Sequence, residues 1–222
     1  MSAPLLVFDL DGTLTDPGEG FVACVAYALE KLGCRPHAEG EIRRHVGPPL
    51  EETLARLLES QAQIPAAVAF YRERYATTGY LENAVYPGIE HALQELHSRG
   101  MRLFVATSKP AVYAERIVEH FGLARYFRAV YGSELDGTRS NKVELLGHLL
   151  DRESISDAVM VGDRAQDMAA ARAHGVHPVG ALWGYGSREE LAQAGAAAFC
   201  EQAQDLPPFL TGLISRRART GG

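Results

Sequence analysis

The chain has 222 residues, of which 46% are hydrophobic and 23% charged; this is ordinary for a globular protein of one domain or one domain with a small insert. Its formal net charge of −6 argues against a nucleic-acid-binding surface, because such surfaces are usually basic. No apolar run approaches the roughly 20 residues that span a bilayer, and the first apolar run ends in aspartates without a preceding basic stretch, unlike a signal peptide. The widely spaced Cys24, Cys34 and Cys200 predict reduced thiols. We therefore expect a cytoplasmic protein, a monomer or homodimer, that binds neither nucleic acid nor membranes.

The first predicted strand ends in a pair of carboxylates. Residues 5–8 form a short apolar run that is typical of a buried parallel strand. Asp9 and Asp11 follow it, and residues at this spacing in an extended chain point to the same side. Gly12 and Thr13 predict a turn. Two like charges this close require a cation or a shared proton, so the pair is costly as structure and suited to catalysis.

The apolar pattern changes along the chain. From residue 17 to residue 80 it is helical throughout, with amphipathic stretches at 21–32, 50–58 and 64–75. After residue 83 strands and helices alternate: we expect strands at 101–106, 129–131, 158–161 and 176–182, and helices at 111–121, 140–150 and 165–174. Residues 215–222 are basic and end in glycines, which predicts a solvated tail.

The strand–helix alternation predicts an α/β fold: a doubly wound, Rossmann-like parallel sheet core with an inserted all-helical cap domain. We place the catalytic core at residues 1–15 and 82–222 and the helical cap at 16–81. In open α/β sheets, ligands bind outside the carboxyl ends of the strands. Asp9, Thr107 and Asp163 all lie at such predicted ends, so we expect them at one site, with the cap acting as its lid.

The acidic residues at these strand ends suit phosphoryl transfer. Asp9 is the candidate nucleophile, since an attacking carboxylate forms an aspartyl-phosphate. Asp11 is placed to protonate the leaving alkoxide and then to deprotonate water. Magnesium prefers a few oxygen ligands and keeps several waters; Asp9, the backbone carbonyl of Asp11 and Asp163 would supply them. We expect Asp167 to hold a metal-bound water or to act as an occasional direct ligand.

Polar and basic residues at the same strand ends predict a phosphate site. Thr107 offers a hydroxyl group, and Ser108 and Lys109 precede Pro110, a favoured first helical residue, so their backbone N–H groups should face an anion. Lys142 opens the next helix and would neutralise both the phosphate and the aspartates. We therefore expect Thr107, Ser108 and Lys142 to bind phosphate. Each segment alone has an ordinary structural explanation, but their joint order at strand ends favours function.

Other conspicuous residues are expected to have structural roles. Trp183 and Tyr185 lie in a glycine-rich loop that we expect to pack onto the core. His174 and His177 lie close together in the sequence, but no further ligand pair accompanies them, so a zinc site is not expected.

These motifs together resemble those of haloacid dehalogenase superfamily phosphatases that carry a helical cap after the first motif. The residues that carry the resemblance are Asp9-Leu-Asp-Gly-Thr-Leu-Thr, Thr107-Ser108, Lys142, and Gly162-Asp163 with Asp167. The resemblance covers nearly the whole chain and implies magnesium-dependent phosphoaspartyl chemistry. Residues 135–139 and 183–187 resemble a bacterial branch described as phosphoglycolate-phosphatase-like, which includes 5′-nucleotidases.

Other members of that superfamily fit less well. Dehalogenases lack a carboxylate at the position of Asp11, and ion-pumping ATPases carry Thr there and have membrane helices. Sugar-phosphate mutases share the aspartate pair but need a second phosphate cradle, and residues 17–80 show no clear one. A catalytically silent binding protein on this fold is the remaining alternative; intact Asp9, Asp11, Lys142 and Asp163 argue against it.

Substrate selection must depend on the cap, because the motifs address only the phosphoryl group. A cap of this size suits a small phosphorylated metabolite. The carboxylate of 2-phosphoglycolate would need a basic partner, and the basic cluster of the cap is Arg43, Arg44 and His45. A nucleotide base would need an aromatic wall, for which the candidates are Phe21, Tyr27, Phe70 and Tyr71. The branch resemblance favours a 5′-nucleotidase, with a phosphoglycolate phosphatase or another small-metabolite phosphatase as the alternative.

Overall fold

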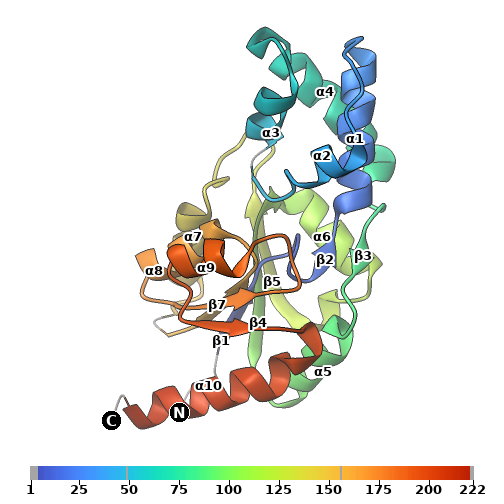
Figure 1. Cartoon of the computed structure of the whole chain (residues 1–222). Coiled ribbons are helices and arrows are strands. Elements are labelled where there is room, and N and C mark those ends of the chain that lie inside the picture. The colour runs from blue at the N-terminus through green and yellow to red at the C-terminus, as the bar shows by residue number, and fades with distance from the viewer. Residues whose placement is uncertain (1–4, 49, 156, 221–222) are drawn as a thin grey trace. The chain divides into compact units, whose positions relative to one another are not determined.

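The computed structural model describes residues 5–48, 50–155 and 157–220. They separate into two compact units (Figure 1). One, here called the core unit, contains the described residues of 1–14 and 85–222; the other, the helical unit, contains those of 15–84. Where the chain passes between the units, β2 (Thr15–Asp16) and β3 (Ala84–Val85) form a two-stranded sheet.

The core unit is built on a six-stranded sheet with the order β5-β4-β1-β6-β7-β8, in which each pair of neighbouring strands is parallel. The strands are β1 (Leu5–Phe8), β4 (Arg102–Pro110), β5 (Phe127–Ser133), β6 (Val159–Gly162), β7 (His177–Ala181) and β8 (Ala198–Cys200). Four of them match the strands expected after residue 83. The predicted α/β fold with a doubly wound parallel sheet and a helical insert is thereby confirmed.

Helices cover both faces of the sheet (Figure 1). They are α5 (Ile89–Ser98), α6 (Ala111–His120), α7 (Lys142–Arg152), α8 (Ala165–Ala173), α9 (Arg188–Gln193) and α10 (Leu206–Thr220), with short 3₁₀ turns at Ala124–Tyr126 and Ala203–Asp205. Alternation along β1 explains how both faces are buried. Leu5 and Val7 join a core cluster with residues of α7 and α8. Phe8 follows Val7 and therefore points to the opposite face, where it contacts Phe127 edge to face.

The strand order places a topological switch point beside β1. The chain proceeds from β1 to β4 and β5 on one side, and then crosses back to β6, β7 and β8 on the other. Phe8 is paired with Val105 of β4 and with Val161 of β6, so the carboxyl ends of these three central strands lie at one level. Ligands bind at such a point in open α/β sheets.

The helical unit contains four α-helices and a terminal π-helical turn. They are α1 (Gly18–Lys31), α2 (Glu39–Arg43), α3 (Leu50–Leu57), α4 (Ile64–Arg74) and η2 (Tyr75–Gly79), with a 3₁₀ turn at Gln61–Gln63. Gly20 and Gly79 allow α1 and η2 to approach closely, since a Cβ atom on Gly20 would lie 2.1 Å from the carbonyl oxygen of Gly79. Phe21, Tyr71 and Tyr75 form an aromatic cluster within this unit.

The last described residues of the chain are helical, which the sequence analysis did not predict. Residues 215–220, expected as a solvated tail, belong to α10, and Ser215 and Arg216 are exposed there; residues 221 and 222 lie outside the described part. Arg217 ties this helix to the core unit through an ion pair with Asp157 of 2.8 Å. In the described residues, no helix is both long enough and apolar enough to cross a membrane.

Candidate active site

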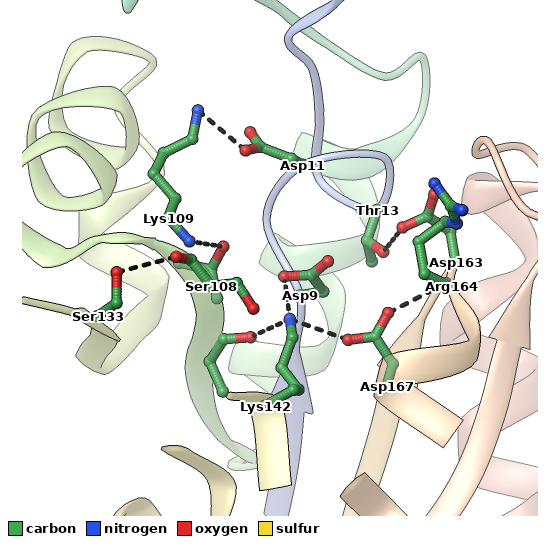
Figure 2. Close-up of polar contacts among 12 residues, drawn as sticks. Asp9, Asp11, Thr13, Ser108, Lys109, Ser133, Lys142, Asp163, Arg164 and Asp167 are labelled. Atoms are coloured by element: carbon green, nitrogen blue, oxygen red, sulfur yellow. Dashed lines mark hydrogen bonds and ion pairs between the residues drawn. The ribbon is translucent and has the colours of Figure 1, made fainter. Parts of the chain in front are cut away.

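Three of the expected site residues lie at the carboxyl ends of the three central strands. Asp9 follows β1, Thr107 lies in β4, and Asp163 follows β6. The backbone N–H of Asp9 donates a hydrogen bond to the carbonyl of Val161 (2.9 Å), which extends the pairing of β1 with β6 by one residue. Figure 2 shows the side chains of Asp9, Asp163 and their neighbours turned toward one another. The structure therefore brings together residues that are separated by about 150 positions in the sequence.

Lys142 joins two of the aspartates. It is the first residue of α7, and Asn141 caps that helix by accepting hydrogen bonds from the first turn. Its Nζ atom lies 2.6 Å from Asp9 Oδ1 and 2.9 Å from Asp167 Oδ1, and it donates to the carbonyl of Ala106 at 3.0 Å. Burial alone would lower the pKa of Lys142, but the charges of Asp167 and Asp9 raise it above its ordinary value. The ammonium group is therefore charged and oriented by three acceptors.

The second carboxylate of the cluster, Asp163, is held on both oxygens. Thr13 Oγ1 donates to Oδ1 at 3.1 Å, and the backbone N–H of Tyr185 donates to Oδ2 at 2.8 Å. Burial raises the pKa of Asp163 well above its usual value, and repulsion from Asp9 and Asp167 raises it further. Oxygen atoms of these three aspartates lie within 4.8 Å of one another, and all three residues are buried. A cluster of buried carboxylate oxygens in this arrangement fits a hard divalent cation.

Asp167 is engaged by protein donors on each side of its carboxylate. Oδ2 accepts from the backbone N–H of Arg164 at 3.1 Å, while Oδ1 faces the Lys142 ammonium. Its pKa is raised by burial, although Lys142 acts in the opposite direction. Glu190 of α9 fixes the same turn, since its Oε1 accepts from Arg164 Nε at 3.0 Å and from the N–H of Ala165 at 2.9 Å. No motif pointed to Glu190, which lies 26 residues after the arginine that it contacts.

A glycine-rich loop at residues 183–187 lies against these aspartates. A Cβ atom on Gly184 would lie 2.3 Å from the carbonyl oxygen of Gly12 and 2.4 Å from Asp163 Cβ. Trp183 Nε1 donates to the carbonyl of Thr13 at 2.9 Å. Trp183 and Tyr185, which were expected to pack the loop onto the core, also contact the site: the first bonds to Thr13 and the second to Asp163. The spacing of the glycines was the available signal, since close backbone approach requires residues without a side chain.

Asp11 forms an ion pair that the sequence did not suggest. Its Oδ2 atom lies 2.9 Å from Lys109 Nζ (Figure 2), and only 7% of the Lys109 side chain is exposed. Its Oδ1 atom is buried and has no hydrogen-bond partner among the described residues. Burial raises the pKa of Asp11, an effect that Lys109 opposes. Lys109 thus holds one oxygen of the Asp11 carboxyl group, and the other oxygen can accept or donate a hydrogen bond to a substrate.

The expected phosphate-binding segment is ordered by β5. Thr107 is buried, and its Oγ1 accepts from the backbone N–H of Lys109 at 3.2 Å, so this N–H is already bonded and does not face an open anion site as expected. The Ser108 carbonyl accepts from Ser133 Oγ at 2.9 Å. A Cβ atom on Gly132 would lie 2.6 Å from the carbonyl oxygen of Lys109. Residues 107–109 therefore lie in a fixed conformation at the end of β4.

The three basic residues expected to influence selectivity lie in the helical unit. Arg43 forms an ion pair of 3.2 Å with Asp16. Arg44 is exposed. Burial lowers the pKa of His45, and the charges of Arg56 and Arg44 lower it further. The charge of Arg43 is therefore compensated by Asp16, and the charged form of His45 is disfavoured.

Comparison with known proteins identifies the family. A model of the haloacid dehalogenase-like hydrolases matches residues 6–181. The chain is 44% identical to a 5′-nucleotidase of Pseudomonas aeruginosa over 210 residues, which are 93% of this chain and 95% of that protein. It is 43% identical to the tyrosine-protein kinase PtkA of Mycobacterium tuberculosis over 83% of this chain, but the match covers only 64% of that protein. It is 29% identical to a phosphoglycolate phosphatase of Vibrio cholerae over 87% of this chain and 90% of that protein.

A solved structure of a predicted phosphatase from Clostridium acetobutylicum superposes with a TM-score of 0.89 at 36% identity, covering 96% of this chain and all of that one. The chain therefore belongs to the haloacid dehalogenase-like hydrolase family, as its motifs suggested. It is an enzyme of the phosphoric monoester hydrolase class.

Proposed function

We propose that this enzyme hydrolyses phosphomonoesters with the help of Mg²⁺ by forming and breaking a phosphoryl bond to Asp9. The observation that carries the proposal is the setting of the Asp9 carboxylate. It lies at the switch point of the sheet, its Oδ1 atom is fixed by Lys142 at 2.6 Å, and the other acidic residues of the site surround it. In Figure 2 the second oxygen of Asp9 points away from the ammonium group, as a nucleophilic oxygen should.

The acidic cluster fits the proposed metal ion. Asp9, Asp163 and the backbone carbonyl of Asp11 would hold it, and Asp167, whose oxygens already face Lys142 and the Arg164 N–H, would hold one of its waters. When bound, Mg²⁺ would neutralise charge on the transferring phosphoryl group. It would also reduce the mutual repulsion of the carboxylates, which otherwise raises the pKa of Asp163 together with burial.

In the first half-reaction, an oxygen of Asp9 attacks phosphorus while the bond from phosphorus to the ester oxygen breaks. The proton of the Asp11 carboxyl group passes to the departing alkoxide, which leaves as an alcohol. Burial, which raises the pKa of Asp11, helps this group to carry the proton. Thr107, Ser108 and Lys142 hold the phosphoryl oxygens in line.

In the second half-reaction, water attacks the phosphorus of phospho-Asp9. Asp11, now ionised, takes a proton from that water, and the bond from phosphorus to the Asp9 oxygen breaks. Inorganic phosphate is released, the Asp9 carboxylate is restored, and Asp11 is again protonated. We propose that residues 16–81 form a cap, which would exclude bulk water during the transfer.

The nucleophile is tested by Asp9→Asn. An amide is a poor nucleophile, so Mg²⁺-dependent release of phosphate from p-nitrophenyl phosphate should fall by at least about 10³-fold. Mass spectrometry of rapidly quenched wild-type enzyme should show one added phosphoryl group, and the variant should show none. Asp151→Asn, which makes the same change on the exposed side of α7, is the matched control. If Asp9→Asn retained more than a few per cent of wild-type turnover, Asp9 would not be the nucleophile.

The metal assignment is tested by calorimetric titration with Mg²⁺. Asp163→Ala should abolish measurable binding, because a ligand is lost. Asp167→Ala should weaken binding by about 10–100-fold, as is usual when a residue orients a ligand or water of the metal. Equal affinities in wild type and Asp163→Ala would remove Asp163 from the metal site.

The substrate class that we propose is nucleoside 5′-monophosphates. The 44% identity to a 5′-nucleotidase, against 29% to a phosphoglycolate phosphatase, supports this choice. The helical unit offers further support. A carboxylate-bearing substrate would need positive charge there, and the basic cluster offers little of it: Arg43 is paired with Asp16, the charged form of His45 is disfavoured by burial, and the exposed Arg44 is left. Phosphoglycolate or another small phosphorylated metabolite is the alternative.

A phosphate-release screen separates these substrates. We expect kcat/KM to be highest for one or more nucleoside 5′-monophosphates in a panel with 2-phosphoglycolate and sugar phosphates. Turnover of 2-phosphoglycolate without turnover of any nucleotide would refute the substrate choice and leave the reaction chemistry untouched. Removal of Mg²⁺ by a chelator should stop every reaction in the panel.

A further inference from the structure

We propose that Lys109 is a positioning residue for the proton transfer by Asp11. This inference rests on the proposed function, because it assumes that Asp11 donates the proton to the leaving group. The sequence predicted a role for the backbone N–H of Lys109 in phosphate binding, but it predicted none for its side chain. Its ammonium group nevertheless lies 2.9 Å from Asp11 Oδ2.

The pair leaves the two oxygens of Asp11 in different situations. Oδ2 is held by Lys109, whereas Oδ1 is buried without a hydrogen-bond partner in the described part of the chain. A buried carboxyl oxygen without a partner is costly. It is explained if the partner of Oδ1 is the ester oxygen of the substrate, to which this oxygen delivers the proton. Holding one oxygen fixes the rotation of the carboxyl group and hence the direction of the other.

Lys109 is itself well anchored. Only 7% of its side chain is exposed, and its backbone N–H donates to Thr107 Oγ1 at 3.2 Å. The preceding carbonyl accepts from Ser133, and Gly132 leaves room for the Lys109 carbonyl, which a Cβ atom there would approach to 2.6 Å. A side chain that starts from a fixed backbone in a confined space can orient its partner with little loss of entropy.

Positioning of a general acid has a specific kinetic consequence. When an alkyl phosphate reacts, the bond from phosphorus to oxygen breaks as the Asp11 proton moves to that oxygen. When p-nitrophenyl phosphate reacts, p-nitrophenolate is a stable anion and leaves without a proton. The value of kcat/KM reports the steps up to leaving-group departure and is independent of the second half-reaction. A loss confined to alkyl esters therefore identifies a fault in proton delivery.

The test compares kcat/KM for p-nitrophenyl phosphate and for an alkyl phosphate monoester that the wild-type enzyme hydrolyses. Lys109→Met removes the charge and keeps the length of the side chain. We expect kcat/KM for the alkyl ester to fall at least about tenfold more than for the aryl ester, a part of the 10²–10⁴-fold that a complete general-acid step provides. Lys109→Arg should retain most of the alkyl activity. Lys31→Met, the same substitution at an exposed lysine, should change neither value.

A double-mutant cycle establishes whether Lys109 acts through Asp11. Asp11→Asn should itself show the larger loss on the alkyl ester, and adding Lys109→Met to it should bring no further selective loss. Equal losses on both esters in Lys109→Met, or a rise in KM alone, would overturn the proposal. Failure of the proposed function is distinct: the wild type would then hydrolyse neither ester, or Asp11→Asn would show no dependence on the leaving group.

Discussion

The core unit contains a buried network of charged side chains, whereas the ion pairs of the helical unit are partly exposed. In the core unit, the side chains of Lys142, Asp9 and Asp167 are at most 9% exposed, although all are ionisable. In the helical unit, the pair of Arg43 and Asp16 has side chains that are 42% and 31% exposed. Burial of charge costs several kcal/mol per ion before any compensation, whereas exposed pairs contribute little.

We relate this difference to two tasks of the enzyme, the reaction itself and the choice of substrate. The buried charges of the core unit are interdependent, so a change in one leaves another without compensation. The partly exposed pairs of the helical unit can be replaced one at a time at small cost. A unit of that kind suits the part of the enzyme that we propose to choose the substrate, and the core suits the part that every substrate must meet.

The largest test of this comparison is the stability cost of breaking one ion pair in each unit. Lys142→Ala leaves the buried carboxylates of Asp9 and Asp167 without their cation and should lower the free energy of unfolding by about 3–5 kcal/mol. Arg43→Ala breaks the exposed pair with Asp16 and should cost at most about 1 kcal/mol. Urea denaturation followed by circular dichroism, with metal chelated, measures both. Similar costs for the two variants would contradict the comparison.

Much of the core site follows from the sequence because topology alone determines it. Short apolar runs identified the strands, and parallel strands bring their carboxyl ends to one edge. The positions of Asp9, Thr107 and Asp163 could therefore be inferred before any contact was known. Lys142 could be inferred as the start of a helix that follows β5.

The remaining contacts could not be predicted because they depend on packing of side chains across the fold. The pairs of Lys109 with Asp11 and of Glu190 with Arg164 have no periodic signal, since each joins residues of different elements that lie far apart in the sequence. The helical conformation of residues 215–220 was missed for a different reason. Basic composition was given more weight than Pro207 and Pro208, which fit the first turn of α10.

A second test concerns the glycine-rich loop and is expected to have a smaller effect. In Gly184→Ala the new Cβ atom would lie 2.3 Å from the Gly12 carbonyl oxygen and 2.4 Å from Asp163 Cβ, so backbone or side chain must move. We expect a loss of about 1–3 kcal/mol in stability, together with weaker Mg²⁺ binding by calorimetry. Gly40→Ala in α2, where no atom lies within 4 Å of the new Cβ, is the matched control. Unchanged metal affinity in Gly184→Ala would show that the loop does not hold Asp163 in its binding position.

The smallest effect, taken per unit of pH, is the pH dependence of stability in metal-free protein. Burial and neighbouring carboxylates raise the pKa of Asp163 above the value of about 3.9 expected in the unfolded chain. Between these two values the folded state binds more protons than the unfolded state. The free energy of unfolding must therefore fall as pH rises through that window, by up to about 1.4 kcal/mol per pH unit for one such group.

Two histidines act with the opposite sign and make a matched variant necessary. Burial lowers the pKa values of His45 and His177 in the folded state. The unfolded state therefore binds more protons at these two residues, and their contribution to the free energy of unfolding rises with pH up to about 6.5, the ordinary pKa of histidine. Asp163→Asn retains these histidines and removes only the titrating carboxyl group, and its unfolding free energy should fall less steeply above pH 4 than that of the wild type. Saturating Mg²⁺ should flatten the slope in the wild type, because the metal binds the ionised form, and should leave the variant unchanged. Parallel pH profiles for wild type and Asp163→Asn in the presence of a chelator would show that the Asp163 carboxyl group does not lower the stability of the folded state as pH rises.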